Sequence, residues 1–451
     1  MSMIWDDKKV EIAYWLLGIS KGEITSPASL LSSKARLDHN DDIEQKLKKQ
    51  GLEKIFEEIE LPLIGVLEKM EKLGIGINQQ AVKKLTDSFQ ERTKKLDSEI
   101  KKIVGKDFNL NSPQQLAAVL FDTLNINNGK GRRTKMGHRS TNFSALENLK
   151  DAHPIINLII DYRELFKLLS TYLEPWKLLG DRIYPTFLQT GTSTGRLSCQ
   201  NPNLQNVPPV LRQVFVPARG YKLVSFDYSQ VELRVLATVA QDAKMIDAFN
   251  NNVDIHQLTA SQVFHVLLDQ VTKEQRQLGK TLNFGVVYGM GTAAFAKTSG
   301  LKRAEAELFI SEYFADFSRV RQWHEEVKKS LREKGYVENL NGRRRWLLSV
   351  FSGDPWQVAE AERAAINMPI QSLAADIIKM AMVKIDEEIL RYTQNDVRMI
   401  LTIHDELLFE IADDKLKESI PRIKDIMESV YKLAVPLKVE YAVGEGWGEL
   451  K

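Results

Sequence analysis

The sequence predicts an α+β fold in which a small antiparallel sheet is interrupted by a long helical insertion. Residues 222–227 form a short apolar run that ends in an acid, and residues 398–411 have the pattern of a β-hairpin. Residues 231–333, which lie between these two segments, have mostly helical spacing. A last strand is expected around residues 439–443. The strands of one sheet are therefore predicted to come from distant parts of the chain.

The remaining elements are predicted from apolar spacing and from helix-start signals. Residues 111–113 (Asn-Ser-Pro) mark a helix start, with proline at the first helical position. Residues 18–52 are polar, irregular and rich in charge, so a linker is expected there. Helices are also predicted over residues 6–17, 53–104, 114–124, 143–178, 355–392 and 414–433, with short strands between 182 and 224.

The composition is that of an ordinary soluble protein. Of 451 residues, 43% are hydrophobic and 27% are charged, and this length suggests about two to four domains. No apolar run approaches the roughly 18–20 residues that span a bilayer, and Asp6 and Asp7 argue against a secretory signal. The single cysteine, Cys199, excludes an internal disulfide and a zinc site built from cysteines. We therefore expect a protein of the cytoplasm or another intracellular compartment, with no membrane partner.

The net charge does not by itself indicate a nucleic-acid-binding protein, because 62 Lys and Arg residues nearly balance 60 Asp and Glu residues. Proteins of that class need positive charge only where the phosphates lie, so the distribution of charge matters more than its sum. Two basic clusters occur, one over residues 130–139 and one at Arg343, Arg344 and Arg345. Either cluster alone fits a solvated loop as well as a phosphate-binding surface.

Two acids at predicted strand ends are the first candidates for chemistry. Asp227 ends an apolar strand, and Asp405 lies at the bend of the predicted hairpin with Glu406 beside it. One such acid is usually a cap or a solvated side chain. Two acids from distant apolar strands can instead bridge a pair of Mg²⁺ ions about 3.5–4 Å apart. That arrangement suits phosphoryl transfer, because one ion activates the attacking 3′-hydroxyl and the other neutralises the leaving pyrophosphate.

Four side chains form a stripe along one predicted helix. Arg276, Lys280, Phe284 and Tyr288 are each four residues apart, so they lie on one helix face. The cations suit a triphosphate, and the aromatic rings suit a base and a sugar. The alternative is a surface helix with a mixed face. His256, considered alone, is better explained as a core or capping histidine.

Two further polar segments have the composition of a nucleic-acid contact. One comprises residues 194–198 and 203–208, and the other places Arg363, Asn367 and Gln371 four apart on one helix. Amide and guanidinium groups on one face can bind the minor-groove acceptors that every base pair presents, so they test pairing geometry rather than sequence. The alternative for the helical segment is an exposed polar face.

Taken together, these segments resemble the family A DNA polymerases, the group typified by bacterial DNA polymerase I. The matching motifs, in the family's order, are Ser225–Arg234 (SFDYSQVELR), Arg276–Gly289 (RQLGKTLNFGVVYG) and Thr402–Leu407 (TIHDEL). Segments reading Thr-Gly-Arg-Leu-Ser, Asn-Gly-Arg-Arg-Arg and Arg-Ala-Ala-Ile-Asn also fall where the family has them. The resemblance runs from about residue 55 to the end of the chain. It implies a template-directed DNA polymerase that extends a primer with deoxynucleotides by a two-metal mechanism.

The resemblance implies the shape of a right hand, made of thumb, palm and fingers. The expected parts are an N-terminal remnant or linker (1–52), the thumb (53–178), the first part of the palm (179–238), the fingers (239–350) and the second part of the palm (351–451). The expected partners are primer–template DNA and deoxynucleoside triphosphates, bound by a monomer.

The resemblance also assigns roles to individual residues. Asp227, Tyr228 and Asp405 would bind two Mg²⁺ ions, for which Mn²⁺ can substitute, with Glu406 close by as a catalytic residue. The incoming nucleotide would be bound by Arg276, Lys280, Phe284, Tyr288, His256, Gln230 and Glu232. Lys280 would also donate a proton to pyrophosphate, and Glu232 would crowd the sugar 2′-position of a ribonucleotide. Contacts with DNA would come from Arg196, Asn206, Arg363, Asn367, Gln371 and His404, and from Thr134, Lys135, Arg139, Ser140 and Thr141 in the thumb-tip loop.

Some expectations concern what is missing, and some alternatives stay open. The residues that precede the thumb contain no strand with the Asp-x-Glu pair of proofreading members, so neither a 3′–5′ exonuclease nor a 5′-nuclease is expected. A metal-dependent nuclease would use the paired acids but would have no use for Arg276 and Lys280. A non-catalytic DNA-binding module would not need Asp227 or Asp405. A reverse transcriptase also remains open, because Glu232 opposes ribonucleotide incorporation but says nothing about an RNA template.

Overall fold

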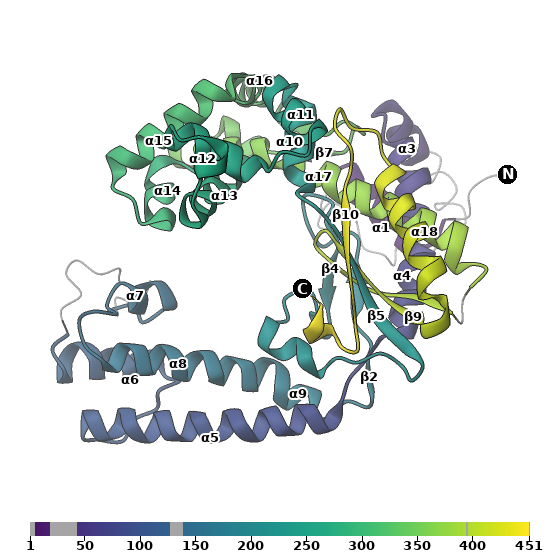
Figure 1. Ribbon diagram of the computed structural model, residues 1–451. Coiled ribbons are helices and arrows are strands. Elements are labelled where there is room, and N and C mark those ends of the chain that lie inside the picture. Colours follow the sequence, from purple (N-terminus) through teal and green to yellow (C-terminus); the bar gives the residue numbers. More distant parts are fainter. Residues whose placement is uncertain (1–4, 19–42, 127–138, 394–395, 451) are drawn as a thin grey trace. The chain divides into compact units, whose positions relative to one another are not determined.

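The computed structural model describes residues 5–18, 43–126, 139–393 and 396–450 (Figure 1). The chain divides into two compact units. Unit 1 comprises residues 1–75, 184–209 and 217–451, and unit 2 comprises residues 76–183 and 210–216. The fold is α+β, as the sequence predicts: helices dominate, and the principal sheet has four strands.

The sheet of unit 1 is antiparallel throughout, with strand order β10-β5-β9-β8. Its strands are β5 (Tyr221–Tyr228), β8 (Val397–Ile403), β9 (Glu406–Ala412) and β10 (Val439–Gly444). The consecutive residues Leu223–Phe226 are all buried, so this part of β5 is covered on both faces of the sheet. Phe226 packs edge-on against Phe409, with ring centroids 5.5 Å apart. The predicted strand, hairpin and final strand are therefore confirmed.

Helices α4 (Leu61–Leu73) and α18 (Leu416–Ser429) pack against this sheet, and α17 (Pro355–Ile385) packs against both of them. Helix α4 contacts β8, and α18 contacts β9 and β10, on the same side of the sheet in Figure 1. The long helix α17 also packs against α10 (Val231–Ala240). The hydroxyl of Tyr228 donates to the carbonyl of Met427 at 2.7 Å, which ties the end of β5 to α18.

The predicted helical insertion is confirmed and forms a group of helices away from the sheet, reached through α10 and α17 (Figure 1). Its members are α11 (Ala243–Asn250), α12 (Ile255–Phe264), α13 (Lys273–Val287), α14 (Thr292–Ser299), α15 (Arg303–Asp316) and α16 (Ser318–Lys334). Helix α13 begins with a capping box, in which Thr272 and Gln275 each bind the backbone N–H of the other. The short strands of unit 1 are β3 (Thr186–Leu188), β4 (Ser198–Gln200), β6 (Tyr336–Glu338) and β7 (Arg344–Trp346).

The N-terminal segment is more regular than its sequence predicts. Helix α1 (Asp7–Leu16) is confirmed, and residues 43–49 are also helical, ahead of α3 (Glu53–Ile55) and a π-turn at Phe56–Glu60. The expectation of an irregular linker throughout 18–52 is wrong for residues 43–49. Ile43 and Leu47, one turn apart, are buried in the same cluster as α1, so two apolar residues suffice when a neighbouring helix covers them.

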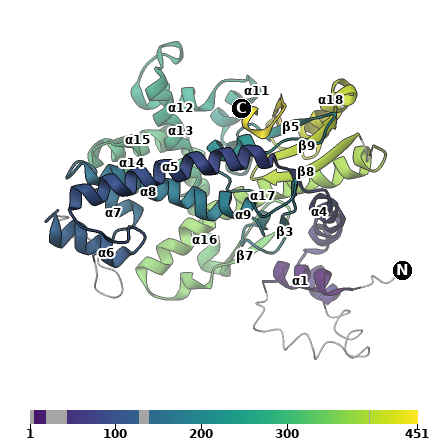
Figure 2. The ribbon, with the colours of Figure 1, turned by 90° about the horizontal axis from the view of Figure 1, so that it is seen from below.

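Unit 2 is helical, and its two longest helices, α5 (Gln79–Val104) and α8 (Ile155–Leu168), run side by side (Figure 2). Its other elements are α6 (Pro113–Ala118), α7 (Phe143–Glu147), α9 (Glu174–Trp176), and the short strands β1 (Ile75–Gly76, across the unit boundary) and β2 (Arg182–Ile183). Ser112 caps α6, as predicted. The predicted helix over 143–178 is interrupted, because Pro154 begins α8 anew. Unit 2 begins at residue 76, so α4 belongs to unit 1.

No helix in the described ranges is long and apolar enough to cross a membrane.

Candidate active site

A group of carboxylates gathers where β5 ends beside the β8–β9 turn. The strand register sets Asp227 directly opposite Glu406 on one side and Glu440 on the other. The N–H of Tyr228 donates to the carbonyl of Asp405 at 3.1 Å, so the turn is attached to the strand end. Acids that are far apart in the sequence therefore lie at one edge of the sheet, as the hairpin prediction requires.

The electrostatics of this group favour a bound cation. Partial desolvation, followed by the charges of Glu406, Asp405 and Glu440, raises the pKa of Asp227 to about 7. Burial also raises the pKa of Asp405, against the opposing effect of Arg196 and His404. Carboxylates held together in this way repel one another, and positive charge would relieve that repulsion.

The donor set fits a hard cation whose remaining ligands come from water and a substrate. In the described ranges, no group of three or more His, Cys, Asp or Glu side chains is arranged to hold a metal ion by itself. Magnesium in phosphoryl-transfer sites commonly uses only one or two carboxylates, and water and substrate phosphates complete its shell. Asp227 and Asp405, with the backbone carbonyl of Tyr228, are chemically suited to that role.

Next to these acids, Glu232 is buried in α10 and is held by two partners. It is only 4% exposed. Its Oε1 lies 2.5 Å from Nη2 of Arg196, and its Oε2 accepts from the hydroxyl of Tyr288 at 3.1 Å. Burial raises the pKa of Glu232, and Arg196 opposes that shift. Partial desolvation of the Tyr288 hydroxyl, together with the Glu232 carboxylate, raises the pKa of Tyr288 to about 12. The three residues come from separate predicted motifs, and the structure brings them into contact.

The predicted stripe lies along α13 and ends at Tyr288, its C-terminal cap. Phe284 and Tyr288 are nearly parallel, with ring centroids 6.3 Å apart. Lys280 is exposed. Nε of Arg276 donates to Asp254 at 2.7 Å, so this cation has a carboxylate partner in the present conformation.

His256 is buried in α12, where it belongs to a hydrogen-bonded group with a residue of α13. It is 3% exposed, and its Nδ1 lies 3.1 Å from Nδ2 of Asn283. Asn283 also bonds Thr259, and the backbone N–H of His256 donates to Asp254. Desolvation lowers the pKa of His256 to about 4, so the ring is neutral at physiological pH. Its surroundings match the core-histidine alternative in this conformation, and its predicted nucleotide contact stays a prediction.

Comparisons with known proteins identify the family of this chain. A family model described as DNA polymerase family A matches residues 79–449. The chain belongs to DNA polymerase family A. Members of the family generally use divalent metal ions.

Individual family members are similar over most of this chain. The chain is 42% identical over 407 residues to the thermostable DNA polymerase I of Thermus filiformis, a match covering 88% of the chain and 48% of that relative. It is also 42% identical over 409 residues to DNA polymerase I of Deinococcus radiodurans, covering 88% of the chain and 42% of the relative. The chain thus spans about half the length of the curated relatives it matches.

A solved family A structure shares the fold. The polymerase domain of Pol1 from M. smegmatis, solved in complex with DNA primer–template and dNTP, has a TM-score of 0.87 and 33% sequence identity. The match covers 99% of this chain and 80% of that one.

The predicted minor-groove residues of this family A chain share helix α17. Arg363 is exposed, and Asn367 and Gln371 are half-buried. Nδ2 of Asn367 lies 3.4 Å from the carbonyl of Tyr288, and a Cβ on Gly289 would lie 3.5 Å from Arg363. This face of α17 therefore adjoins the end of the α13 stripe.

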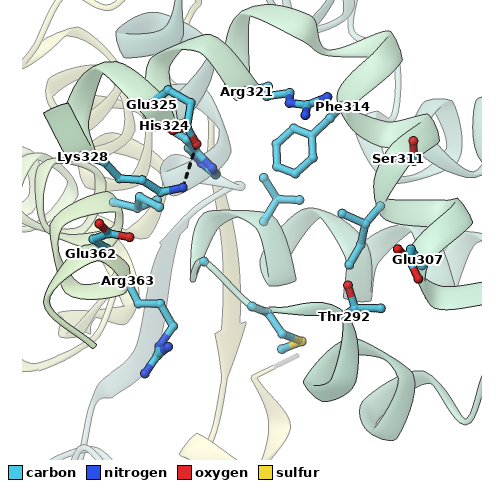
Figure 3. A pocket seen from close by; sticks show the side chains of 15 residues that line it. Thr292, Glu307, Ser311, Phe314, Arg321, His324, Glu325, Lys328, Glu362 and Arg363 are labelled. Carbon is cyan, nitrogen blue, oxygen red and sulfur yellow. Dashed lines mark hydrogen bonds and ion pairs between the residues drawn. The ribbon is translucent and has the colours of Figure 1, made fainter. Parts of the chain in front are cut away.

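A hollow of about 400 Å³ lies beside Arg363, between the residues that follow α13 and helices α15, α16 and α17 (Figure 3). Figure 3 shows Phe314 and His324 on one side of it and Arg363 on another. His324 is buried, which lowers its pKa to about 4. The lining carries both signs of charge, and Lys328 pairs with Glu325 at 2.7 Å.

The other residues assigned to DNA or nucleotide are distributed over loops of both units. In unit 1, Asn206 and His404 are exposed, and Gln230 is half-buried in the left-handed conformation that begins α10. In unit 2, Arg139 pairs with Asp122 at 3.2 Å, Ser140 is half-buried, and Thr141 is buried with its carbonyl bound by Arg163. Thr134 and Lys135 lie outside the described residues.

Arg343 does not match either interpretation of its basic cluster. It is 2% exposed and pairs with Glu60 and Asp376, so it belongs to neither a solvated loop nor a phosphate-binding surface. The local sequence could not reveal this, because both partners lie in other segments.

Three residues near the site carried no functional assignment from the sequence. Glu440 faces Asp227, Asp254 holds Arg276 and caps α12, and Asn283 holds His256. Of these three residues, only Asp254 could have been recognised from the sequence, since an acid just before a helical run is a typical N-cap.

Proposed function

We propose that this chain is a DNA-directed DNA polymerase, which extends a primer 3′ end by template-directed nucleotidyl transfer. The observation that carries the proposal is the convergence of Asp227 and the Asp405 turn at one sheet edge, in a chain of family A. The relatives are named DNA polymerase I, and the M. smegmatis domain was solved with primer–template and dNTP. The exposed cation Lys280 on the neighbouring helix favours a polymerase over a nuclease, which has no triphosphate to bind.

Asp227, Asp405 and the carbonyl of Tyr228 would hold two divalent cations, Mg²⁺ or its substitute Mn²⁺, with Glu406 close by. When bound, the cations would lower the pKa of the attacking 3′-hydroxyl and neutralise the charge of the leaving pyrophosphate. The role of the acids is to fix both ions against one nucleotide. Desolvation and the neighbouring acids raise the pKa of Asp227 to about 7, which supports this role, because a bound cation would compensate the uncorrected negative charge.

The face of α13 would bind the incoming deoxynucleotide. Lys280 would contact the triphosphate and protonate the leaving pyrophosphate, and Phe284 and Tyr288 would lie against the nascent base pair. Arg276 would exchange its carboxylate partner, Asp254, for phosphate oxygens. His256 would contact the triphosphate only if α13 moves, since the His256 side chain is buried in the present conformation.

Glu232 would exclude ribonucleotides. Its carboxylate is fixed by Arg196 and Tyr288, so it cannot easily turn away from a 2′-hydroxyl. Gln230 would contact the same nucleotide. Replacing Glu232 with alanine should therefore raise ribonucleotide use relative to deoxynucleotide use, which competition between the two nucleotides at one template position would measure.

The residues proposed to contact primer or template are Arg196, Asn206, Arg363, Asn367, Gln371, His404, Thr134, Lys135, Arg139, Ser140 and Thr141. We retain the division into thumb (53–178), palm (179–238 and 351–451) and fingers (239–350) as part of this proposal. We also propose that this polypeptide does not excise a mismatched primer end, because none of the described strands carries an Asp-x-Glu pair.

Primer extension tests the proposal. With a labelled primer–template, Mg²⁺ and deoxynucleotides, the protein should lengthen the primer, whereas a nuclease would shorten it. Asp227→Asn and Asp405→Asn should abolish extension but retain DNA binding. Asp414→Asn is the matched control, because it removes an exposed acid just beyond β9. Extension by either site variant at the rate of the control would refute the metal-binding assignment.

A further inference from the structure

A neutral group of four charged side chains is buried in unit 1, away from the carboxylates at the sheet edge. Its members are Glu60, Arg343, Asp376 and Lys379, and none is more than 2% exposed. Nη2 of Arg343 lies 2.6 Å from both Glu60 and Asp376, and Nζ of Lys379 lies 2.7 Å from Glu60. Two positive and two negative charges therefore compensate one another, which buried ions require.

A ring of amides fixes this group further. Asn339 and Asn341 donate to Asp376 at 2.8 and 3.2 Å, and Nε2 of Gln189 donates to Glu60 at 2.8 Å. Trp15 lies against both cations, 5.2 Å from the guanidinium of Arg343 and 5.5 Å from the ammonium of Lys379. With so many partners, the guanidinium has little freedom to move.

The fixed guanidinium lies directly against the backbone of Gly195. A Cβ at this glycine would lie 3.0 Å from Cδ and Nε of Arg343 and 3.2 Å from Cζ, closer than side chains normally approach. The next residue is Arg196, whose carbonyl accepts from the Thr192 hydroxyl at 2.7 Å and closes the turn. Arg196 then reaches Glu232 at 2.5 Å. The turn is therefore supported by the buried charges on one side and contacts the candidate active site on the other.

We propose that Arg343 is a positioning residue for nucleotide incorporation, because it holds the Gly195–Arg196 turn and so places Arg196 against Glu232. The inference rests on the proposed polymerase activity. Movement of the turn would separate Arg196 from Glu232 and would release the carboxylate that faces the sugar. Misplacement of a site residue by about 1 Å can lower a rate by roughly a hundredfold.

Gly195→Ala is the direct test, since it keeps all four buried charges and adds one methyl group between the turn and Arg343. Gly220→Ala is the matched control: both glycines have φ of +84°, but a Cβ at Gly220 would meet nothing within 4 Å. Both variants therefore place an alanine at the same positive φ, and only Gly195→Ala adds a contact with Arg343. We expect Gly195→Ala to lower kcat at least about tenfold with little change in KM for the nucleotide, and Gly220→Ala to match wild type.

Two further measurements separate positioning from a general loss of structure. Gly195→Ala should raise the ratio of ribonucleotide to deoxynucleotide incorporation, whereas partial unfolding would lower both in proportion. In an Arg343→Lys background, the smaller and more flexible ammonium side chain can yield to the new methyl group. Adding Gly195→Ala to that background should therefore cost much less activity than it does in wild type.

The outcomes are distinct from those for the proposed function. If wild type does not extend a primer, the polymerase proposal fails. If wild type extends but Gly195→Ala behaves like Gly220→Ala, the positioning role fails. The role fails equally if the loss caused by Gly195→Ala is the same with Arg343→Lys present, or if the sugar ratio does not move. Should Gly195→Ala not fold, Arg343→Lys alone must lower kcat and raise the sugar ratio, or the inference is wrong.

Discussion

Unit 1 holds two groups of charged side chains that obey opposite rules. The buried group of Glu60, Arg343, Asp376 and Lys379 balances two positive against two negative charges. The charges of Lys379 and Arg343 outweigh desolvation and lower the pKa of Glu60 to about 2. At the sheet edge, by contrast, partial desolvation and the neighbouring acids together raise the pKa of Asp227 to about 7. The charges of the first group balance without a bound ion or ligand. The second carries excess negative charge, which is a feature of a binding site for cations.

The contrast shows that burial alone does not identify a residue that binds a cation or a substrate. Arg343 is more buried than Asp405, and the chain itself supplies its two carboxylate partners. An imbalance of charge that the fold itself does not correct is the more informative signal. Changes in the two groups should therefore affect mainly different properties of the protein, with Arg343 as the exception because it also supports the Gly195–Arg196 turn.

The largest expected effect is on catalysis at the sheet edge. Asp405→Asn should lower the single-turnover extension rate by about a thousandfold or more, since the site loses a metal ligand. The thermal unfolding midpoint without divalent ions should stay the same or rise. Rapid-quench extension and calorimetry would measure the two quantities. A rate within tenfold of wild type, or a large drop in stability, would remove the distinction between the groups.

The buried group should show the reverse pattern. Lys379→Met keeps the volume but leaves Glu60 with one cation fewer, so the free energy of unfolding should fall by about 3–5 kcal/mol. The extension rate of the folded protein should change little. Urea unfolding combined with extension at low temperature would test this. Unchanged stability would mean that Lys379 adds no net stabilisation to the group.

Acid should weaken the buried group through Glu60. Its pKa in the folded protein, about 2, lies below the ordinary value of 4.5. The unfolded chain therefore binds the proton first, and stability is present above about pH 4.5 and is lost as the pH falls toward 2. Glu60→Gln removes this contribution, which is about 3 kcal/mol at neutral pH. Urea midpoints should differ at pH 7 and converge near pH 2, and a constant difference would contradict the account.

The smallest expected effect is a gain in stability at the catalytic edge. Asp227→Asn removes one of several mutually repelling charges. The free energy of unfolding of the metal-free protein should therefore rise by about 1 kcal/mol at neutral pH, after allowance for solvent screening. The control Asp414→Asn should not show this gain. Destabilisation by Asp227→Asn would mean that the acids do not repel one another as described.

Local patterns predicted the parts of the molecule that depend on neighbouring residues. The apolar run before Asp227, the hairpin around Asp405 and the four-residue spacing from Arg276 to Tyr288 each follow from strand or helix geometry. The buried state of Arg343 depends on Glu60 and Asp376, which no local pattern joins to it. The hydrogen-bond partner of His256, Asn283, comes from another helix, and Glu440 lies opposite Asp227 only through the register of β10. Tertiary contacts of this kind have no period in the sequence.

The central claim is that the acids at the sheet edge bind divalent cations for nucleotide transfer. Binding of Mn²⁺, followed by electron paramagnetic resonance in the presence of a dideoxy-terminated primer–template and the matching nucleotide, tests it most directly. We predict two bound ions for the wild type and for Asp414→Asn, and affinity at least about tenfold weaker for Asp227→Asn and Asp405→Asn. Equal numbers of ions bound with equal affinity in all four proteins would contradict the claim.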